Sequence, residues 1–318
     1  MKNSLIFLIF VLLLLFAVRG WWNNQLAAVS LNKDSKTVIL AKGQSLNEIA
    51  EKLKKEGFIK SAYAFKILVG QKGWDKKLQA GTYKLSQSMS AEEVAKVLTG
   101  VPSEIWVTLL EGWRVEEMAD KLNGELKIDN GEFVKMSAEG YMFPDTYLFP
   151  REITVSEIVK AMTDNFEKKF SGDLKAQIRK LSITDEQGLI LASIVEREAR
   201  SDTARKMVAS ILLKRLKIGM GLNADATIQY ALGYQMDEKS WWKRHLGKDD
   251  LKIDSSYNTY LYRGLPPTPI CNPSLSSLKA VADADTNVPY LYYYHDSKGN
   301  SHYAKTLEEH NQNVADNP

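Results

Sequence analysis

The sequence predicts an α+β protein with an N-terminal transmembrane helix, a small α+β module and a larger, mostly helical domain with short strands. One uncharged apolar run near the N-terminus predicts the transmembrane helix. A capped helical pattern that recurs between strand-like stretches predicts the small module, and several longer amphipathic patterns predict the helical domain. The predicted divisions are an anchor at 1–22, a tether at 23–37, the small module at 38–100 and the large domain at 101–318.

The composition is that of a folded protein and excludes several functions. The chain has 318 residues, of which 44% are hydrophobic and 25% charged, enough for two domains with their own cores. Its net charge is only +3 and no basic stripe is visible, so nucleic-acid binding is not predicted. The single cysteine excludes an intramolecular disulfide. The histidines have no metal-binding spacing, so neither a metal site nor a cofactor is predicted; they are His245, His295, His302 and His310.

The apolar run extends from Leu5 to Val18. It is shorter than the about 20 residues that a hydrocarbon core requires, so a cleaved signal peptide is an alternative to a membrane anchor. Arg19, Trp21 and Trp22 follow the run, which is typical of the membrane interface, and no small-residue cleavage site comes directly after it. These features favour an uncleaved anchor. In either case we expect the chain beyond about Asn23 to lie outside the cytoplasmic membrane.

One helical pattern occurs three times after the tether, at residues 45–53, 90–98 and 114–122. The first two copies have capping-box spacing, with Ser45 before Glu48 and Ser90 before Glu93. Strand-like stretches separate the copies, at 37–40, 81–85 and 106–110. Short strands that alternate with capped helices predict a small α+β module that resembles LysM domains, which bind chitin-like and peptidoglycan sugars. An unrelated α+β module is the alternative, because short capped helices are common.

The chain after Asn123 has a different composition. Residues 140–150 are dense in aromatics and prolines and are predicted to be ordered but irregular. Helices are predicted at about 154–170, 173–181, 185–199 and 202–217. From Leu222 onward we expect short helices, loops and a strand at 290–295. The tyrosines of this strand are assigned to core and surface in preference to a sugar platform.

The helix predicted at 185–199 carries a candidate acid, Glu198. At about 100° per residue, Glu198 shares an arc with Leu191, Ile194 and Val195. A carboxyl group among apolar side chains has its pKa raised by desolvation, as a general acid near neutral pH requires. The alternative is that Glu198 reaches water where the helix ends.

Glu196 falls on the nearly opposite side of the same helix, beside Leu189 and Ser193. It precedes Arg200 by four residues, the favourable order for an exposed ion pair. We therefore expect Glu196 to be a surface residue.

Segments rich in amides, hydroxyls and tyrosines follow these helices. Such groups are typical of a sugar-binding groove, since polar atoms bind hydroxyls and flat rings pack on pyranoses. The candidate substrate-binding residues are Asn223, Asp225, Thr227, Gln229, Tyr230, Tyr257 and Asn258. Capping and turn roles are the alternative, which we expect for about half of them.

These segments together resemble the YceG/MltG family of endolytic murein transglycosylases. After the LysM-like opening, the matching motifs occur in order from LEGW to SLKA: LEGW at 110–113, FPDTY at 143–147, ASIVERE at 192–198, NADATIQY at 223–230, YNTY at 257–260, GLPP at 264–267 and SLKA at 277–280. The resemblance implies a single-pass protein of the bacterial inner membrane with a large periplasmic part. One position departs from the family pattern. Ala226 stands where the family usually has proline, and we expect this change to loosen a loop without removing a reactive group.

The resemblance also implies the reaction. The family cuts the β-1,4 bond between N-acetylmuramic acid and N-acetylglucosamine within nascent strands and leaves 1,6-anhydro ends. One carboxyl group suffices: Glu198 first protonates the glycosidic oxygen and then takes the proton of the muramoyl 6-hydroxyl. The implied partners are glycan strands and peptidoglycan synthases.

Two other functions stay open on the sequence alone. A non-catalytic, membrane-tethered peptidoglycan-binding scaffold protein would keep the groove without turnover. A hydrolytic muramidase would need a second carboxylate, for which Asp225 is the candidate.

Overall fold

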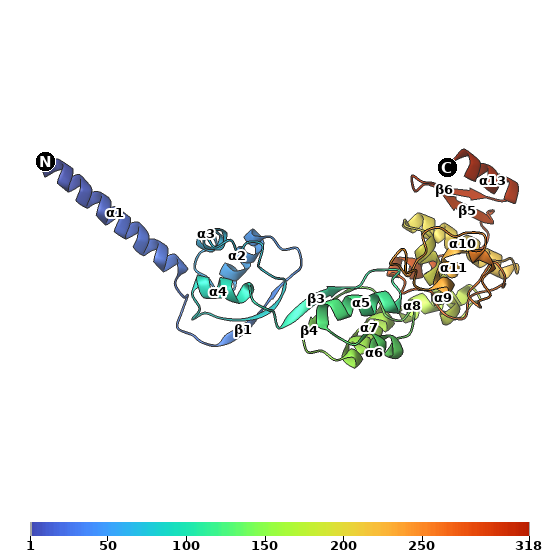
Figure 1. The fold of residues 1–318 in the computed structure, drawn as a ribbon, viewed down its shortest axis with the longest axis horizontal. Helices are drawn as coiled ribbons and strands as arrows, with labels where there is room; N and C mark the ends of the chain where they lie inside the picture. The colour runs from blue at the N-terminus through green and yellow to red at the C-terminus, as the bar shows by residue number, and fades with distance from the viewer. Residues whose placement is uncertain (1, 318) are drawn as a thin grey trace. The chain divides into compact units, whose positions relative to one another are not determined.

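The computed structural model describes residues 2–317, which form a mixed α+β fold of helices α1 to α13 and strands β1 to β6 (Figure 1). Two compact units are present. The first comprises the chain up to Val107 together with Tyr147–Glu152, and the second comprises Thr108–Thr146 and the chain from Ile153 onward. The predicted α+β class is confirmed, while the LysM likeness of the first unit stays a prediction.

Helix α1 (Lys2–Leu26) is longer than the predicted anchor. Its stretch Phe7–Leu26 has 20 residues and a mean hydropathy of 1.6, so it is long and apolar enough to cross a membrane. The helix continues past Trp22 because the polar residues that follow include no helix breaker, and the segment that connects it to β1 is shorter than the predicted tether. A signal sequence near the N-terminus would have the same features.

The first unit contains β1 (Ser35–Leu40), α2 (Leu46–Lys55), α3 (Ala62–Gln71), β2 (Gly81–Ser86) and α4 (Ala91–Leu98). Strands β1 and β2 are antiparallel, and the sheet continues with β3 (Glu104–Thr108) and β4 (Thr146–Pro150) in the order β1-β2-β3-β4. Both predicted capping boxes are confirmed, at the starts of α2 and α4. The prediction that residues 140–150 are wholly irregular was wrong, because their last part pairs as β4.

The second unit is mostly helical, as predicted. Its helices are α5 (Val115–Leu126), α6 (Asn130–Met136), α7 (Val155–Lys169), α8 (Gly172–Lys180), α9 (Asp185–Glu198), α10 (Asp202–Lys217), α11 (Asp225–Leu232), α12 (Leu275–Ala282) and α13 (Leu307–Asp316), with a 3-10 turn at Asp250–Lys252. The bounds of α7 to α10 match the predicted helices to within one residue at each end.

Helix α9 is the centre of this unit. Thr184 and Gln187 form the predicted capping box at its start, and every residue from Gly188 to Val195 is buried. Helices α8, α10 and α12 all pack against it. At Gly188 a Cβ atom would lie 2.6 Å from the Ile178 side chain, so glycine permits the close approach of α8. A helix buried on all sides holds the residues at its C-terminal end firmly.

The chain ends in a hairpin covered by a helix (Figure 1, red end). Strand β5 (Tyr292–His295) pairs antiparallel with β6 (Ser301–Ala304), and α13 contacts both strands. Strand β5 also contacts α10, which joins the hairpin to the helical core. The predicted strand at 290–295 is confirmed, whereas β6 was not predicted.

Candidate active site

Glu198 is the last residue of α9 and lines a cavity of about 470 Å³. The backbone leaves the helix at Ala199 with extended geometry, φ −138° and ψ 144°. The buried body of α9 therefore ends in a half-buried carboxyl group at the cavity wall. The other lining residues come from α10, α11, β5, α13 and the loops before α11 and after the 3-10 turn.

Burial raises the pKa of Glu198 to about 7. The negative charge of Asp225 acts in the same direction. Three groups lower the pKa of Glu198, but together they do not offset the effect of desolvation. They are the Tyr293 hydroxyl, the backbone N–H of Ala226 and the positive charge of Arg197. The Tyr293 hydroxyl donates to the Glu198 carboxylate at 3.0 Å. A carboxyl group of this kind can both donate and accept a proton near neutral pH.

A second cavity, of about 510 Å³, lies on another side of Glu198. Its wall includes Arg197, Ser201 and Asp296. Glu198 and His295 are the residues of the described chain that line both cavities. Glu198 therefore lies where two cavities meet, and an extended ligand has room on both sides of the carboxyl group.

Asn223 and Asp225 line the first cavity together with Glu198. Asn223 has φ 49°, a left-handed conformation that asparagine tolerates better than most residues, and it turns the chain into α11. Asp225 is the first residue of α11 and accepts a hydrogen bond of 2.6 Å from the Tyr260 hydroxyl. The structure therefore brings two of the predicted polar residues to the candidate acid.

The other predicted binding residues do not line this cavity. Thr227 Oγ1 donates to the Ala224 carbonyl at 2.7 Å, and Gln229 Nε2 donates to that of Lys243 at 2.7 Å. The fully buried Asn258 amide donates to two loop carbonyl groups. Gln229 thus joins the loop at Lys243 to α11, whereas Thr227 bonds within the start of its own helix and Asn258 holds the segment just before it.

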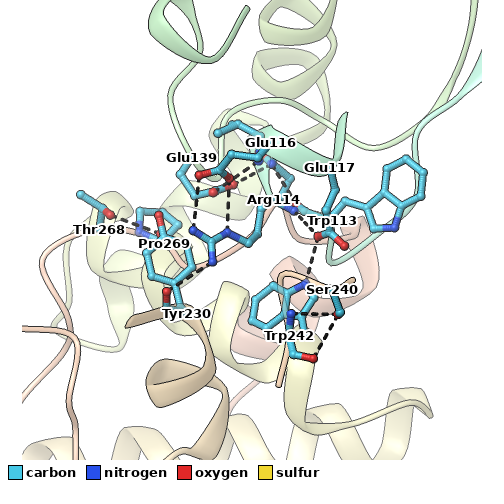
Figure 2. Close-up of polar contacts among 12 residues, drawn as sticks. Trp113, Arg114, Glu116, Glu117, Glu139, Tyr230, Ser240, Trp242, Thr268 and Pro269 are labelled. Carbon is cyan, nitrogen blue, oxygen red and sulfur yellow. Dashed lines mark hydrogen bonds and ion pairs between the residues drawn. The ribbon is translucent and has the colours of Figure 1, made fainter. Parts of the chain in front are cut away.

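Tyr230 and Tyr257 pack against each other with ring centroids 4.8 Å apart. Tyr230 also contacts Arg114, whose guanidinium lies 4.1 Å from the Tyr230 ring centroid. Figure 2 shows Arg114 between Glu116 and Tyr230, and its guanidinium donates to the Glu116 carboxylate and to the Tyr230 carbonyl. Arg114 was not predicted as a site residue. Its signal in the sequence is that it begins the third helical copy, at the position where the first two copies have serine.

Trp242 extends this cluster to the end of α9. Its indole N–H donates to Glu117 at 2.9 Å (Figure 2), and the guanidinium of Arg197 lies 3.8 Å from its ring centroid. Cation–π contacts thus run from Arg197 through Trp242 and Arg114 to Tyr230. They join the C-terminal ends of α9 and α11.

The prediction for Glu196 was wrong. Its side chain is only 5% exposed and pairs with Arg205 at 3.1 Å, not with Arg200. It also accepts hydrogen bonds from the backbone N–H of Ser274, at 2.8 Å, and from the Ser274 hydroxyl. Because Ser274 is the N-cap of α12, Glu196 joins α9, α10 and α12. Helical periodicity cannot reveal a partner so distant in the sequence.

Tyr293 is the functional candidate that the sequence analysis missed. The strand assignment for residues 290–295 is correct, but Tyr292, Tyr293 and Tyr294 line the first cavity, and Tyr293 donates to Glu198. Arg215 of α10 supports this strand, since its Nε donates to the Leu291 carbonyl at 2.7 Å. The alternation of side chains along a strand was the available signal, but nothing in it identifies the face that meets Glu198.

The motif segments of the sequence converge around α9. The buried Asn272 amide oxygen accepts from the backbone N–H groups of Gly140 and Met142, both at 2.9 Å. Its nitrogen donates to the Trp113 carbonyl at 3.0 Å. Asn272, which follows the GLPP segment, therefore joins Trp113 of LEGW to the residues just before FPDTY in one architecture.

Comparison with known proteins identifies that architecture. The sequence model of the YceG-like family matches residues 38–316. A Bacillus subtilis protein named endolytic murein transglycosylase is 33% identical over 320 residues, which cover 89% of this chain and 85% of that protein. The chain belongs to the YceG-like family.

Other YceG-like relatives agree with this assignment and confirm the resemblance seen in the sequence. An endolytic murein transglycosylase of Streptococcus pneumoniae is 28% identical, and the match covers 98% of this chain and 64% of that protein. The crystal structure of a yceG-like protein of Listeria monocytogenes superposes with a TM-score of 0.62 at 28% identity. That match covers 88% of this chain and 99% of the other.

Position 226, where the sequence resemblance implies proline in the family, does not lie in a loop as expected. Ala226 is in the first turn of α11, and its backbone N–H interacts with the Glu198 carboxyl group. Proline has no N–H, so it would remove this interaction while fitting the first turn of the helix. The departure therefore adds a donor at the candidate acid.

Proposed function

We propose that this YceG-like protein is an endolytic peptidoglycan transglycosylase and that Glu198 is its single acid/base catalyst. The observation that carries the proposal is the position of Glu198, whose pKa is raised to about 7, at the junction of two cavities. A strand that continues on both sides of the cut fits such a junction. The substrate class follows from the relatives, which are named endolytic murein transglycosylases.

In the proposed reaction the protonated Glu198 gives its proton to the glycosidic oxygen between N-acetylmuramic acid and N-acetylglucosamine. The bond from the anomeric carbon to that oxygen breaks, and positive charge develops on the muramoyl ring. The Glu198 carboxylate then takes the proton of the 6-hydroxyl as its oxygen bonds to the anomeric carbon. The carboxyl group is protonated again, no water is consumed, and the products are a 1,6-anhydromuramoyl end and a free 4-hydroxyl.

The predicted binding residues divide into two roles in this proposal. Asn223 and Asp225 contact the glycan, because they line the cavity of Glu198. The other five shape the groove by holding its wall through the contacts described above; they are Thr227, Gln229, Tyr230, Tyr257 and Asn258. Arg114 supports the same wall through Tyr230.

The remaining parts of the chain fit an enzyme that works at the membrane surface. Helix α1 would anchor the protein, with both compact units on the periplasmic side of the inner membrane. Residues 38–100, from β1 to α4, would act as a LysM-like module that holds glycan. Nascent strands leave their synthases at this surface, so peptidoglycan synthases are the proposed partners.

The full-length protein in detergent is expected to cut uncrosslinked glycan strands internally, with 1,6-anhydro ends detected by mass spectrometry. Hydrated reducing ends would instead indicate a hydrolytic muramidase. The presence of Asp225 in the Glu198 cavity is the observation that favours that second candidate. Strand binding without cleavage would indicate a scaffold protein.

The pH dependence of cleavage reports the protonation of Glu198. The acid form is needed for the first step, so kcat/KM is expected to fall as the pH rises through about 7. Tyr293→Phe removes a donor that favours the carboxylate, so it raises the pKa and moves this alkaline limb to higher pH. Ala226→Pro should act in the same direction.

Tyr294→Phe is the matched control for this experiment. Tyr294 lines the same cavity, but its described ring contact is with His302. The alkaline limb should therefore stay in place. A limb that does not move in Tyr293→Phe would show that Glu198 does not control the rate.

A further inference from the structure

His295 occupies the same junction as Glu198. These two residues are the ones in the described chain that line both cavities. If Glu198 is to reach a glycosidic oxygen, the bond to be cut must lie at this junction. His295 is therefore beside the two sugars that the bond joins.

The orientation of His295 follows from the strand that carries it. Alternate residues of a strand face the same side, so His295 faces the side of Tyr293. Tyr293 donates to Glu198, and the Tyr293 and His295 ring centroids are 6.0 Å apart. The β5–β6 register pairs His295 with Ser301, whose Oγ lies 3.0 Å from His295 Nδ1. This bond holds the imidazole ring in place.

The other ring nitrogen of His295 lacks a hydrogen-bond partner in the described part of the chain. Nε2 is buried and makes no hydrogen bond within the described residues. A buried polar atom without a partner destabilises the protein unless a ligand supplies the bond. Burial also lowers the pKa of His295, so the ring is neutral near pH 7. Nε2 is thus either a donor or an acceptor, depending on which way the Ser301 hydroxyl points.

We propose that His295 Nε2 forms a hydrogen bond with a hydroxyl group of one of the two sugars at the scissile bond. A hydroxyl group suits either imidazole tautomer because it both donates and accepts. His295 would thereby position the bond at the Glu198 carboxyl group, with Ser301 fixing the ring. This inference rests on the proposed function and adds a specific substrate contact to it.

The test compares two substitutions in the full-length protein. His295→Phe keeps a flat ring without nitrogen, whereas His295→Gln places an amide group near the Nε2 position. We expect kcat/KM on uncrosslinked strands to fall about 10- to 100-fold in His295→Phe, as the loss of a buried hydrogen bond predicts. His295→Gln should recover most of the activity. In a Glu198→Gln background, which binds without cutting, adding His295→Phe should weaken strand binding.

His302→Phe is the matched control. His302 belongs to the same hairpin and bonds Asp296 at 3.1 Å, but it lines neither cavity. Thermal unfolding of each variant shows whether the hairpin is intact. Equal losses of kcat/KM in both phenylalanine variants, or unchanged cleavage and binding in His295→Phe, would overturn the inference. An inactive wild type would refute the proposed function, and the binding comparison would still test His295 separately.

Discussion

Replacing Glu198 with glutamine is expected to reduce the formation of 1,6-anhydro ends about 10³- to 10⁴-fold. The same carboxyl group supplies the proton in the first step and accepts it in the second, and each transfer contributes about 10²-fold or more. Glutamine has nearly the same shape, and its amide oxygen still accepts from Tyr293, so the groove is kept. The measurement is the rate of anhydro-end formation on uncrosslinked strands, read by mass spectrometry.

The same substitution is expected to stabilise the protein. The folded pKa of Glu198, about 7, lies above its unfolded value near 4.5, so the folded form loses stability as the pH rises from about 4.5 to 7. Glutamine does not ionise, so this loss is absent. Since the carboxyl group is only half-buried, we expect about 1–2 kcal/mol more stability at pH 8 and little change at pH 4. Loss of activity together with loss of stability would indicate misfolding and not loss of a catalyst.

Replacing Glu196 with alanine should have the largest effect on stability, about 3–5 kcal/mol. Removal of Glu196 leaves Arg205, whose side chain is 13% exposed, with a longer pair, of 3.5 Å, to the exposed Asp202. It also removes the acceptor for the Ser274 N–H and hydroxyl at the start of α12. Breaking a buried ion pair on one side is costly because the remaining charge stays desolvated. Urea unfolding at pH 7 measures the change.

Asp164→Ala is the matched control for Glu196→Ala. The Lys160–Asp164 pair is also an ion pair, but its side chains are 74% and 64% exposed. Its loss should cost less than about 1 kcal/mol, because water screens the interaction.

Activity separates Glu196 from Glu198. The milder variant Glu196→Gln, assayed well below its unfolding temperature, should still form anhydro ends. A stable, folded Glu196→Gln protein that forms none would assign the catalyst to Glu196 and refute the proposed role of Glu198.

The elements that the sequence predicted well are those determined by neighbouring residues. Helices α7 to α10 follow from apolar residues at helical spacing, and the starts of α2, α4 and α9 follow from capping boxes within four residues. Helix α11 was predicted only as one of the short helices expected after Leu222, without bounds. It is short, its N-cap Ala224 supplies no capping side chain, and Asn223 and Asp225 at its start are residue types that are also common in loops.

The candidate site divides in the same way. Periodicity along one helix made Glu198 a candidate, the family motif at 192–198 favoured it over exposure at the helix end, and the order of the motifs sufficed for the family. The partners of Glu198 come from β5 and α11, which are distant in the sequence, so no local pattern identified Tyr293 or His295. Local sequence patterns likewise did not predict the burial of Glu196 or the structural roles of Thr227 and Asn258.

By itself the sequence determined the α+β class, most of the long helices, the apolar N-terminal segment and the YceG-like family. Those features depend on residues that are close in the chain or on motifs read in order. Only the tertiary structure decided that Glu198 lies between two cavities while Glu196 is buried in an ion pair. Burial and electrostatic environment are set by segments that meet through packing, and a carboxyl group obtains its pKa from that environment.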